Sequence, residues 1–208
     1  MIQKSIGKTF HFNGLEIELH SKVYDPAEDS FLLLEAVSMD SGGNVLELGT
    51  GCALIALECA RQGRKVICTD INPYAVRLAR NNIKKNQKLL KEIIEVRKGD
   101  LFSVIKKGEI FDTILFNPPY LPTSIDEKVD EWFDLAADGG KDGLFVTKKF
   151  LKDVKTYLSS VGRAYFVFSS LSDRCKLEEC LNEEKLRYKV VLSRRFNDEL
   201  LDIYCVYL

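Results

Sequence analysis

Short apolar runs that alternate with helical segments set the strongest limit on how this chain can fold. Runs that are apolar throughout are typical of strands buried on both faces, as in a parallel sheet covered by helices. The alternation therefore predicts an α/β fold with a mostly parallel sheet and helices on both faces. The expected strands cover residues 44–48, 65–70, 93–100, 112–117, 162–170, 188–195 and 200–208.

The N-terminal part has a different pattern. Residues 9–20 alternate around Asn13-Gly14, which favours a hairpin because both residues tolerate the positive φ of a tight turn. A helix is expected to follow, with Asp25 as its cap and Pro26 in its first turn. Within one domain of 208 residues, we expect residues 1–40 to cover a ligand site and residues 41–208 to form the core.

Composition excludes several classes of protein. Hydrophobic residues make up 46% and charged residues 29% of the chain, and the net charge of −1 does not fit a protein that coats nucleic acid. The six cysteines form no C-x-x-C pair, so we expect reduced thiols and no metal site. No signal peptide or long apolar run is present, which predicts a cytoplasmic protein without a membrane span.

Polar residues stand where four of the expected strands end. Ligands of such sheets bind at the carboxyl ends of the strands, so these residues should meet at one site. A turn-forming role can account for any one of them but accounts poorly for four together. They are Glu47, Gly49 and Gly51 after the first strand, Asp70, Asp100 and Asn117.

The glycine segment limits which classes of ligand the site can bind. Position 54 is Leu, so the dinucleotide fingerprint is incomplete, and the lysine of a phosphate-binding P-loop is missing. Asp70 lies 19 residues after Gly51, where a carboxylate can accept hydrogen bonds from ribose hydroxyls. Asp100 could accept from an exocyclic amine of a base. An adenosine linked to a sulfonium fits this set.

The stretch Asn117-Pro118-Pro119-Tyr120 supplies the candidate chemistry. An amide nitrogen is a poor nucleophile because its lone pair is delocalised into the carbonyl. Two acceptors, the Asn117 side-chain oxygen and the Pro118 carbonyl, could hold its hydrogens and direct the lone pair at a methyl group. The prolines fix the loop, and Tyr120 offers a flat face to a planar group.

Five segments resemble the HemK/PrmC family of class I S-adenosylmethionine-dependent methyltransferases, in particular its small archaeal and eukaryotic branch. They are VLELGTGCALIAL, TDINPYAV, GDLF, FDTILFNPPY and VYDPAEDSFLLLEA. The resemblance implies a Rossmann-like seven-stranded sheet with an antiparallel C-terminal strand and an N-terminal β-hairpin. It also implies a site for S-adenosylmethionine. The implied cofactor-binding residues are Tyr24, Glu28, Ser30, Glu47, Gly49, Gly51, Asp70, Ile71, Asp100, Leu101 and Asn117.

Members of this family methylate the glutamine of release factors, so the resemblance implies the Gly-Gly-Gln motif of a class I release factor as substrate. The same tetrapeptide serves N6-adenine and N4-cytosine methyltransferases, and a protein lysine is a further alternative. Residues 121–142 hold seven acids and two lysines, a net −5, which favours a protein over a nucleic acid. The basic residues of 77–98 are interpreted as a solvated face.

One partner is also expected. The third strand should lie at a sheet edge, where Ile93, Ile94 and Val96 could pair with another chain. The resemblance implies a small zinc-binding activator subunit at this edge, giving a heterodimer. Nucleic acid and membrane are not expected partners.

Overall fold

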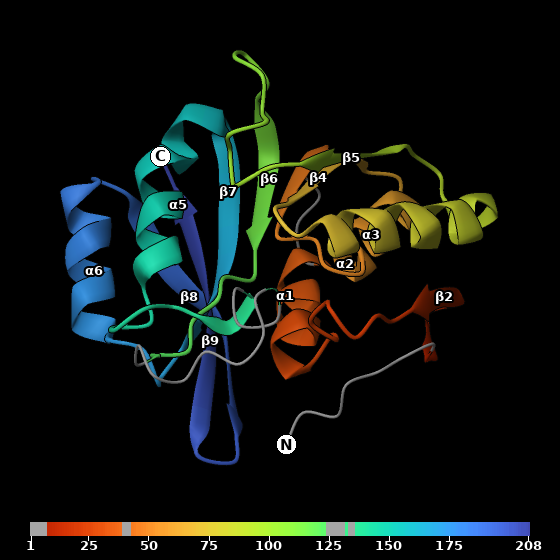
Figure 1. Ribbon diagram of the computed structural model, residues 1–208. Coiled ribbons are helices and arrows are strands. Elements are labelled where there is room, and N and C mark those ends of the chain that lie inside the picture. Colours follow the sequence, from red (N-terminus) through yellow and green to blue (C-terminus); the bar gives the residue numbers. More distant parts are fainter. Residues whose placement is uncertain (1–7, 39–42, 124–131, 133–135) are drawn as a thin grey trace.

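The computed structural model describes residues 8–38, 43–123, 132 and 136–208. A seven-stranded sheet forms its centre, in the order β5-β4-β3-β6-β7-β9-β8. Only β9 runs against its neighbours β7 and β8, which confirms the mostly parallel sheet with an antiparallel C-terminal strand (Figure 1). The strands are β3 (Asn44–Leu48), β4 (Lys65–Asp70), β5 (Ile94–Lys98), β6 (Phe111–Phe116), β7 (Leu158–Ser169), β8 (Arg187–Phe196) and β9 (Glu199–Tyr207).

Helices cover both faces of this sheet, as the buried strands predict. One apolar cluster joins one face to α1 (Glu28–Ser38), α2 (Leu54–Arg61) and α3 (Pro73–Asn86), which the short helix η1 (Gln87–Leu89) follows. The other cluster joins the opposite face to α5 (Phe145–Tyr157) and α6 (Arg174–Glu183). Neighbours on β6 divide between them, since Leu115 belongs to the first cluster and Ile114 to the second.

Local sequence signals fix where two helices begin. The Asn72 side chain accepts a hydrogen bond from Tyr74 N–H at 2.9 Å, and Pro73 occupies the first helical position of α3, as expected. Helix α1 begins at Glu28, two residues later than predicted, because the Ala27 carbonyl accepts its first bond, from Phe31 N–H at 3.1 Å. Asp25 and Pro26 therefore precede the helix.

The predicted N-terminal hairpin is confirmed as β1 (Thr9–Phe12) and β2 (Leu15–Glu18). Asn13 and Gly14 form its turn with φ of 48° and 84°, which is the reason these residue types suit the position. The hairpin forms its own two-stranded sheet, separate from the central one.

Two asparagines of α3 attach this hairpin to the core. The Asn82 side chain accepts from Glu18 N–H at 2.9 Å and donates to Glu18 C=O at 3.1 Å. Asn86 repeats the arrangement with Glu16, at 2.9 and 2.8 Å. Asn82 also donates to the Cys52 carbonyl at 2.9 Å, so one fully buried amide joins the hairpin, α3 and the glycine segment.

Within the described ranges, no helix combines the length and the apolar character that crossing a membrane requires.

Candidate active site

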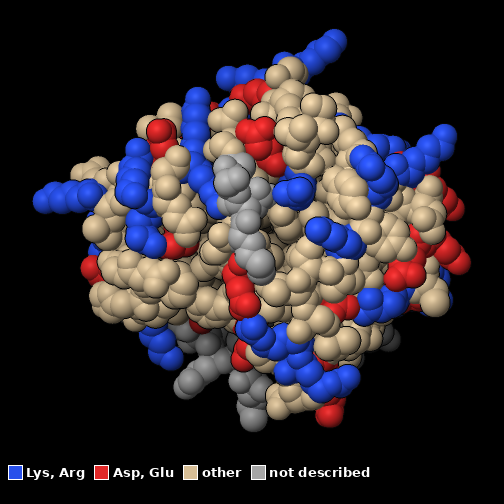
Figure 2. Space-filling model, turned by 180° about the vertical axis from the view of Figure 1, so that it is seen from behind, with Lys and Arg blue, Asp and Glu red and all other residues tan. Residues whose placement is uncertain are grey.

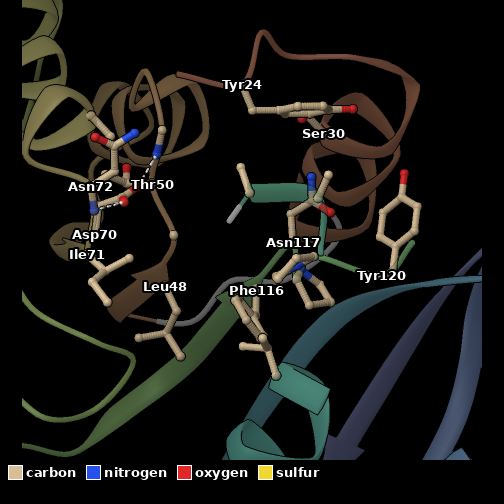
Figure 3. Close-up of a pocket in the computed structure, with 18 of the residues that line it drawn as sticks. Tyr24, Ser30, Leu48, Thr50, Asp70, Ile71, Asn72, Phe116, Asn117 and Tyr120 are labelled. Carbon is tan, nitrogen blue, oxygen red and sulfur yellow. Dashed lines mark hydrogen bonds between the residues drawn. The ribbon is translucent and has the colours of Figure 1, made fainter. Parts of the chain in front are cut away.

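A cavity of about 870 Å³ opens at the carboxyl ends of the parallel strands. It lies where the chain order of the sheet reverses between β3 and β6, the place where sheets of this type bind ligands. Gly49, Asp70, Asp100 and Asn117 all line it, so the four strand ends identified from the sequence do meet at one site. Figure 3 shows Asp70 and its neighbours on one side of Asn117 and Tyr120 on the other.

The glycine segment after β3 lines the cavity on the side where Asp70 lies. Gly49, Gly51 and Ala53 have φ of 66°, 56° and 65°, a left-handed conformation that glycine adopts without strain. Asp70 holds the segment in place, because its Oδ2 accepts from Gly51 N–H and its Oδ1 accepts from Asn72 N–H, each at 2.9 Å. Each carboxylate oxygen retains a lone pair for another donor, such as a hydroxyl.

Glu47 is a buried carboxyl group in the cavity wall, 4% exposed. Its Oε2 accepts from the Thr50 hydroxyl at 2.6 Å. Burial raises its pKa to about 8, and the nearby charge of Asp70 adds to the increase. A cation bound beside this group would favour its ionised form, and S-adenosylmethionine, the cofactor that the resemblance implies, carries ammonium and sulfonium charges.

Residues after β4 and β5 form an open apolar and polar wall. Ile71 is 41% exposed although it follows directly on the buried Asp70, and its side chain lines the cavity. Asp100 is exposed and Leu101 is half-buried with φ of 45°, and both also line the cavity. An apolar surface beside a carboxylate suits a purine ring that carries an amino group.

The Asn117-Pro118-Pro119-Tyr120 stretch lies at the centre of the cavity wall, and all four residues line it. The Asn117 Oδ1 atom is buried and has no hydrogen-bond partner among the described residues. An orphaned buried acceptor costs about 1–3 kcal/mol, so its retention beside a cavity marks a place where a ligand donor can bind.

A hydrogen bond from Ser172, which lies just before α6, holds this stretch in place. Ser172 Oγ donates to the Tyr120 carbonyl at 2.8 Å. A Cβ on Gly143, whose φ is 72°, would lie 2.5 Å from that carbonyl and 2.3 Å from Ser172 Oγ. The loop is therefore packed so closely that only glycine fits at position 143 without displacing it.

The N-terminal residues reach the cavity through Asp29. Its Oδ2 accepts from the Tyr24 hydroxyl at 3.2 Å and the Tyr120 hydroxyl at 3.1 Å, and its Oδ1 accepts from Ser30 N–H at 2.6 Å. Tyr24 and Ser30 line the cavity, as the resemblance implies. Glu28, the acid expected there, is exposed and does not line it, and Asp29 takes that place.

Several cavity residues were missed by sequence reasoning. In the sequence, Asp29 has only the pattern of an acid favoured in the first turn of a helix, and Phe145 and Glu199 have no pattern that marks them. Of the acidic segment 121–142, residues 124–131 and 133–135 lie outside the described residues. Among its described acids, Asp138 accepts from Gly140 N–H at 2.8 Å and Asp142 pairs with Lys148 at 2.8 Å.

These residues fit S-adenosylmethionine as a set. Asp70 and Ile71 provide acceptors and an apolar surface for a nucleoside, Glu47 provides a buried counter-charge, and the glycine segment allows close approach. The volume is also within the range of about 300–1,000 Å³ found for small-molecule sites.

The fold and this site define a methyltransferase that uses S-adenosylmethionine. The chain belongs to the methyltransferase small domain family, whose model matches residues 21–134.

Individual relatives extend the likeness over most of the chain. A putative protein N5-glutamine methyltransferase of Methanocaldococcus jannaschii is 44% identical over 184 residues, covering 88% of this chain and 89% of the relative. The eRF1 methyltransferase catalytic subunit mtq2 of Schizosaccharomyces pombe is 30% identical, over 93% of this chain and 92% of the relative. The structure of the E. cuniculi Mtq2-Trm112 complex has the same fold, with a TM-score of 0.69 at 23% identity, covering 89% of this chain and 98% of that chain.

Proposed function

We propose that this protein methylates the side-chain N5 atom of the glutamine in the Gly-Gly-Gln motif of a class I release factor. The observation that carries the proposal is the buried Asn117 Oδ1, which has no hydrogen-bond partner among the described residues and belongs to a residue that lines the cavity. The relatives named as protein N5-glutamine and eRF1 methyltransferases support the choice of a glutamine over other planar nitrogen groups.

Asn117 and Pro118 would act by orienting the substrate amide. The Asn117 Oδ1 and the Pro118 carbonyl would each accept one N–H, which turns the nitrogen lone pair out of conjugation and toward the cofactor. S-adenosylmethionine, when bound, supplies an electrophilic methyl group. Because proline has no N–H and fixes φ, the acceptor positions are set before the substrate arrives.

Tyr120 and Tyr24 would limit the space around the amide. Burial and the neighbouring Asp29 raise the pKa of both tyrosines, so their hydroxyls remain protonated donors at neutral pH. Neither acts as a base. The methylated amide loses its extra proton after transfer, so these residues need only hold and enclose the substrate.

Mass spectrometry of the release factor tests the proposal. Incubation with this protein and S-adenosylmethionine is expected to add one methyl group, of 14 Da, to the Gly-Gly-Gln peptide, and Asn117→Ala should abolish the addition. Incubation with total RNA and DNA, or with other proteins, provides the comparison. Methyl groups found only in nucleic acid, or only on lysine side chains, would overturn the proposed substrate.

The charge distribution supports a protein substrate. Figure 2 shows Lys and Arg side chains spread over the back of the molecule, with acidic and uncharged residues between them. Three basic residues of 77–98 bind to other groups of the chain. Lys85 pairs with Glu16 and Glu18 at 2.6 and 2.7 Å. Arg97 pairs with Glu109, and Arg80 donates to the Val96 carbonyl. Phosphate binding would require such cations to be available.

The edge strand β5 supports a partner subunit. Gly99 N–H donates to the Asp70 carbonyl at 3.0 Å, so the backbone groups of alternate residues point toward β4. Those of Ile94, Val96 and Lys98 consequently point to the open edge, where the Val96 carbonyl accepts from Arg80 at 3.1 Å. We propose that a small zinc-binding activator pairs here, and the proposal is supported by the E. cuniculi structure of the same fold, which is a complex with a second chain, Trm112.

Co-expression tests this partner. Ile93 is 64% exposed beside the edge, and Ile93→Asp should weaken the complex in size-exclusion chromatography, whereas Ile110→Asp at the start of β6 should not. A chain that is monomeric, well behaved and fully active alone would contradict the need for an activator. We further propose that residues 1–40 and 41–208 act as one catalytic domain in the cytoplasm, where release factors function.

A further inference from the structure

One aromatic residue and one cation stand at the mouth of the cavity without a role in the core. Phe145, the first residue of α5, is 58% exposed, and Lys149 follows it by one helical turn. The Lys149 ammonium lies 4.4 Å from the centroid of the Phe145 ring. Both side chains line the same cavity as Asn117. We refer to the pair as the Phe145–Lys149 surface.

The backbone holds this surface in a fixed relation to the catalytic stretch. Phe145 N–H donates to the Gly139 carbonyl at 2.9 Å, and Gly139 N–H donates to the Leu121 carbonyl at 2.9 Å. Leu121 directly follows Tyr120 and is itself 37% exposed on the cavity wall. Two hydrogen bonds therefore connect the aromatic residue at the mouth to the loop that holds Asn117.

Packing does not explain the exposed ring. Phe145 belongs to neither of the two apolar clusters, whereas the next aromatic residue of α5, Phe150, is fully buried in one of them. An exposed aromatic ring with a nearby cation is a common way to bind another molecule, and aromatic residues dominate the energetics of protein interfaces. Its position beside the candidate catalytic residues indicates which molecule that is.

We propose that the Phe145–Lys149 surface binds the polypeptide segment that carries the target glutamine, an inference that rests on the proposed function. Glycines beside the glutamine would let the peptide backbone lie flat on the Phe145 ring, and the Lys149 ammonium would donate to backbone carbonyls. A nucleic-acid base could also stack on a ring. However, Asp29, Asp138 and Glu199 line the same cavity, and these acids oppose a phosphate chain.

Steady-state kinetics with the release factor test the inference. Phe145→Ala is expected to raise KM for the release factor about tenfold, the effect of losing about 1.4 kcal/mol of binding. Phe145→Leu should fall between Phe145→Ala and the wild type. Lys149→Gln should raise KM less and should reduce the dependence of KM on salt. The Kd for S-adenosylmethionine should not change in any of these variants.

Ile110→Ala is the matched control. Ile110 is a similarly exposed apolar residue, at 44%, but it precedes β6 at the opposite end from Asn117. Its KM should equal that of the wild type.

A wild-type KM in both Phe145→Ala and Lys149→Gln would overturn the inference while leaving the proposed function intact. Absence of release-factor methylation by the wild-type chain would instead overturn the proposed function. A raised KM for nucleic acid alone would show that a base is the occupant and would also overturn the inference.

Discussion

Asp29 Oδ2 accepts hydrogen bonds from two tyrosine hydroxyls, Tyr24 at 3.2 Å and Tyr120 at 3.1 Å. The two tyrosines come from segments almost a hundred residues apart, and the carboxylate that joins them is 3% exposed. This contact connects the N-terminal part of the chain to the catalytic stretch.

Removing that carboxylate should affect stability and catalysis together. Asp29→Ala leaves the hydroxyls of two half-buried tyrosines without their acceptor, and we expect the free energy of unfolding to fall by about 1–3 kcal/mol, with a lower kcat. Urea unfolding and methyl-transfer rates measure the two effects. In a double-mutant cycle, Tyr120→Phe should cost less in the Asp29→Ala background than in the wild type. Additive losses would show that the pair is not coupled.

Asn117→Ala should separate activity from stability. Because Asn117 Oδ1 is buried without a partner in the described part of the chain, its removal should leave Tm unchanged or raise it, while the methyl-transfer rate falls by about a hundredfold or more. Thr113→Val is the matched control, on the strand that Asn117 follows, since Thr113 Oγ1 is also buried without a described partner but does not line the cavity. It should raise Tm and keep activity. A large loss of Tm in Asn117→Ala would contradict this assignment.

Glu47 should make ligand binding depend on pH. Its pKa of about 8 lies above the ordinary carboxyl value of 4.5, so between these values the folded protein without ligand holds a proton that the unfolded chain has lost. The free energy of unfolding should therefore decrease as pH rises across this interval. Conversely, a cationic ligand prefers the ionised group, so its affinity should increase over the same range, by up to about tenfold per pH unit.

Calorimetry in buffers of different ionisation enthalpy measures this linkage. Binding of S-adenosylmethionine at pH 7 should release protons, and Glu47→Gln should remove both the release and the pH dependence. Glu92→Gln, at an exposed acid before β5, should change neither. Proton release that persists in Glu47→Gln would assign the titration to another group.

Asp70→Ala should mainly lower cofactor affinity. The substitution removes the expected acceptor for ribose hydroxyls and also releases Gly51 N–H and Asn72 N–H, so the glycine segment loses its support. We expect Kd for S-adenosylmethionine to rise by about a hundredfold or more, equivalent to two hydrogen bonds to a charged group. Asp100→Ala, at an exposed acid, should have a smaller effect. Unchanged affinity in Asp70→Ala would exclude the ribose role.

The sequence predicted the sheet and the meeting of the strand ends because these depend on local patterns. Continuous apolar strands require cover on both faces, and Asn72-Pro73 and Asn13-Gly14 specify a helix start and a turn by backbone geometry alone. Asp70 and Asn117 could be placed because they follow directly on such strands.

Residues that reach the cavity from distant segments could not be predicted in this way. Glu28 and Asp29 are adjacent acids in one helical turn, and only the direction in which α1 packs decides that Asp29 points inward. Glu199 lines the cavity because β9 inserts between β7 and β8, a pairing that depends on tertiary structure. Phe145 has no periodic pattern to mark it, since its ring is not buried in the core.

The asparagine contacts between α3 and β2 have a consequence for strand register. Four residues along a helix advance about 6 Å, and two residues along a strand advance about 6.6 Å, so Asn82 and Asn86 match the spacing of Glu18 and Glu16. Two side chains of a helix thereby take the place of a second neighbouring strand, on the edge of β2 that does not pair with β1. A shift of one residue would turn the β2 backbone groups away from both amides, so the two asparagines of α3 oppose a one-residue change in the register of the hairpin.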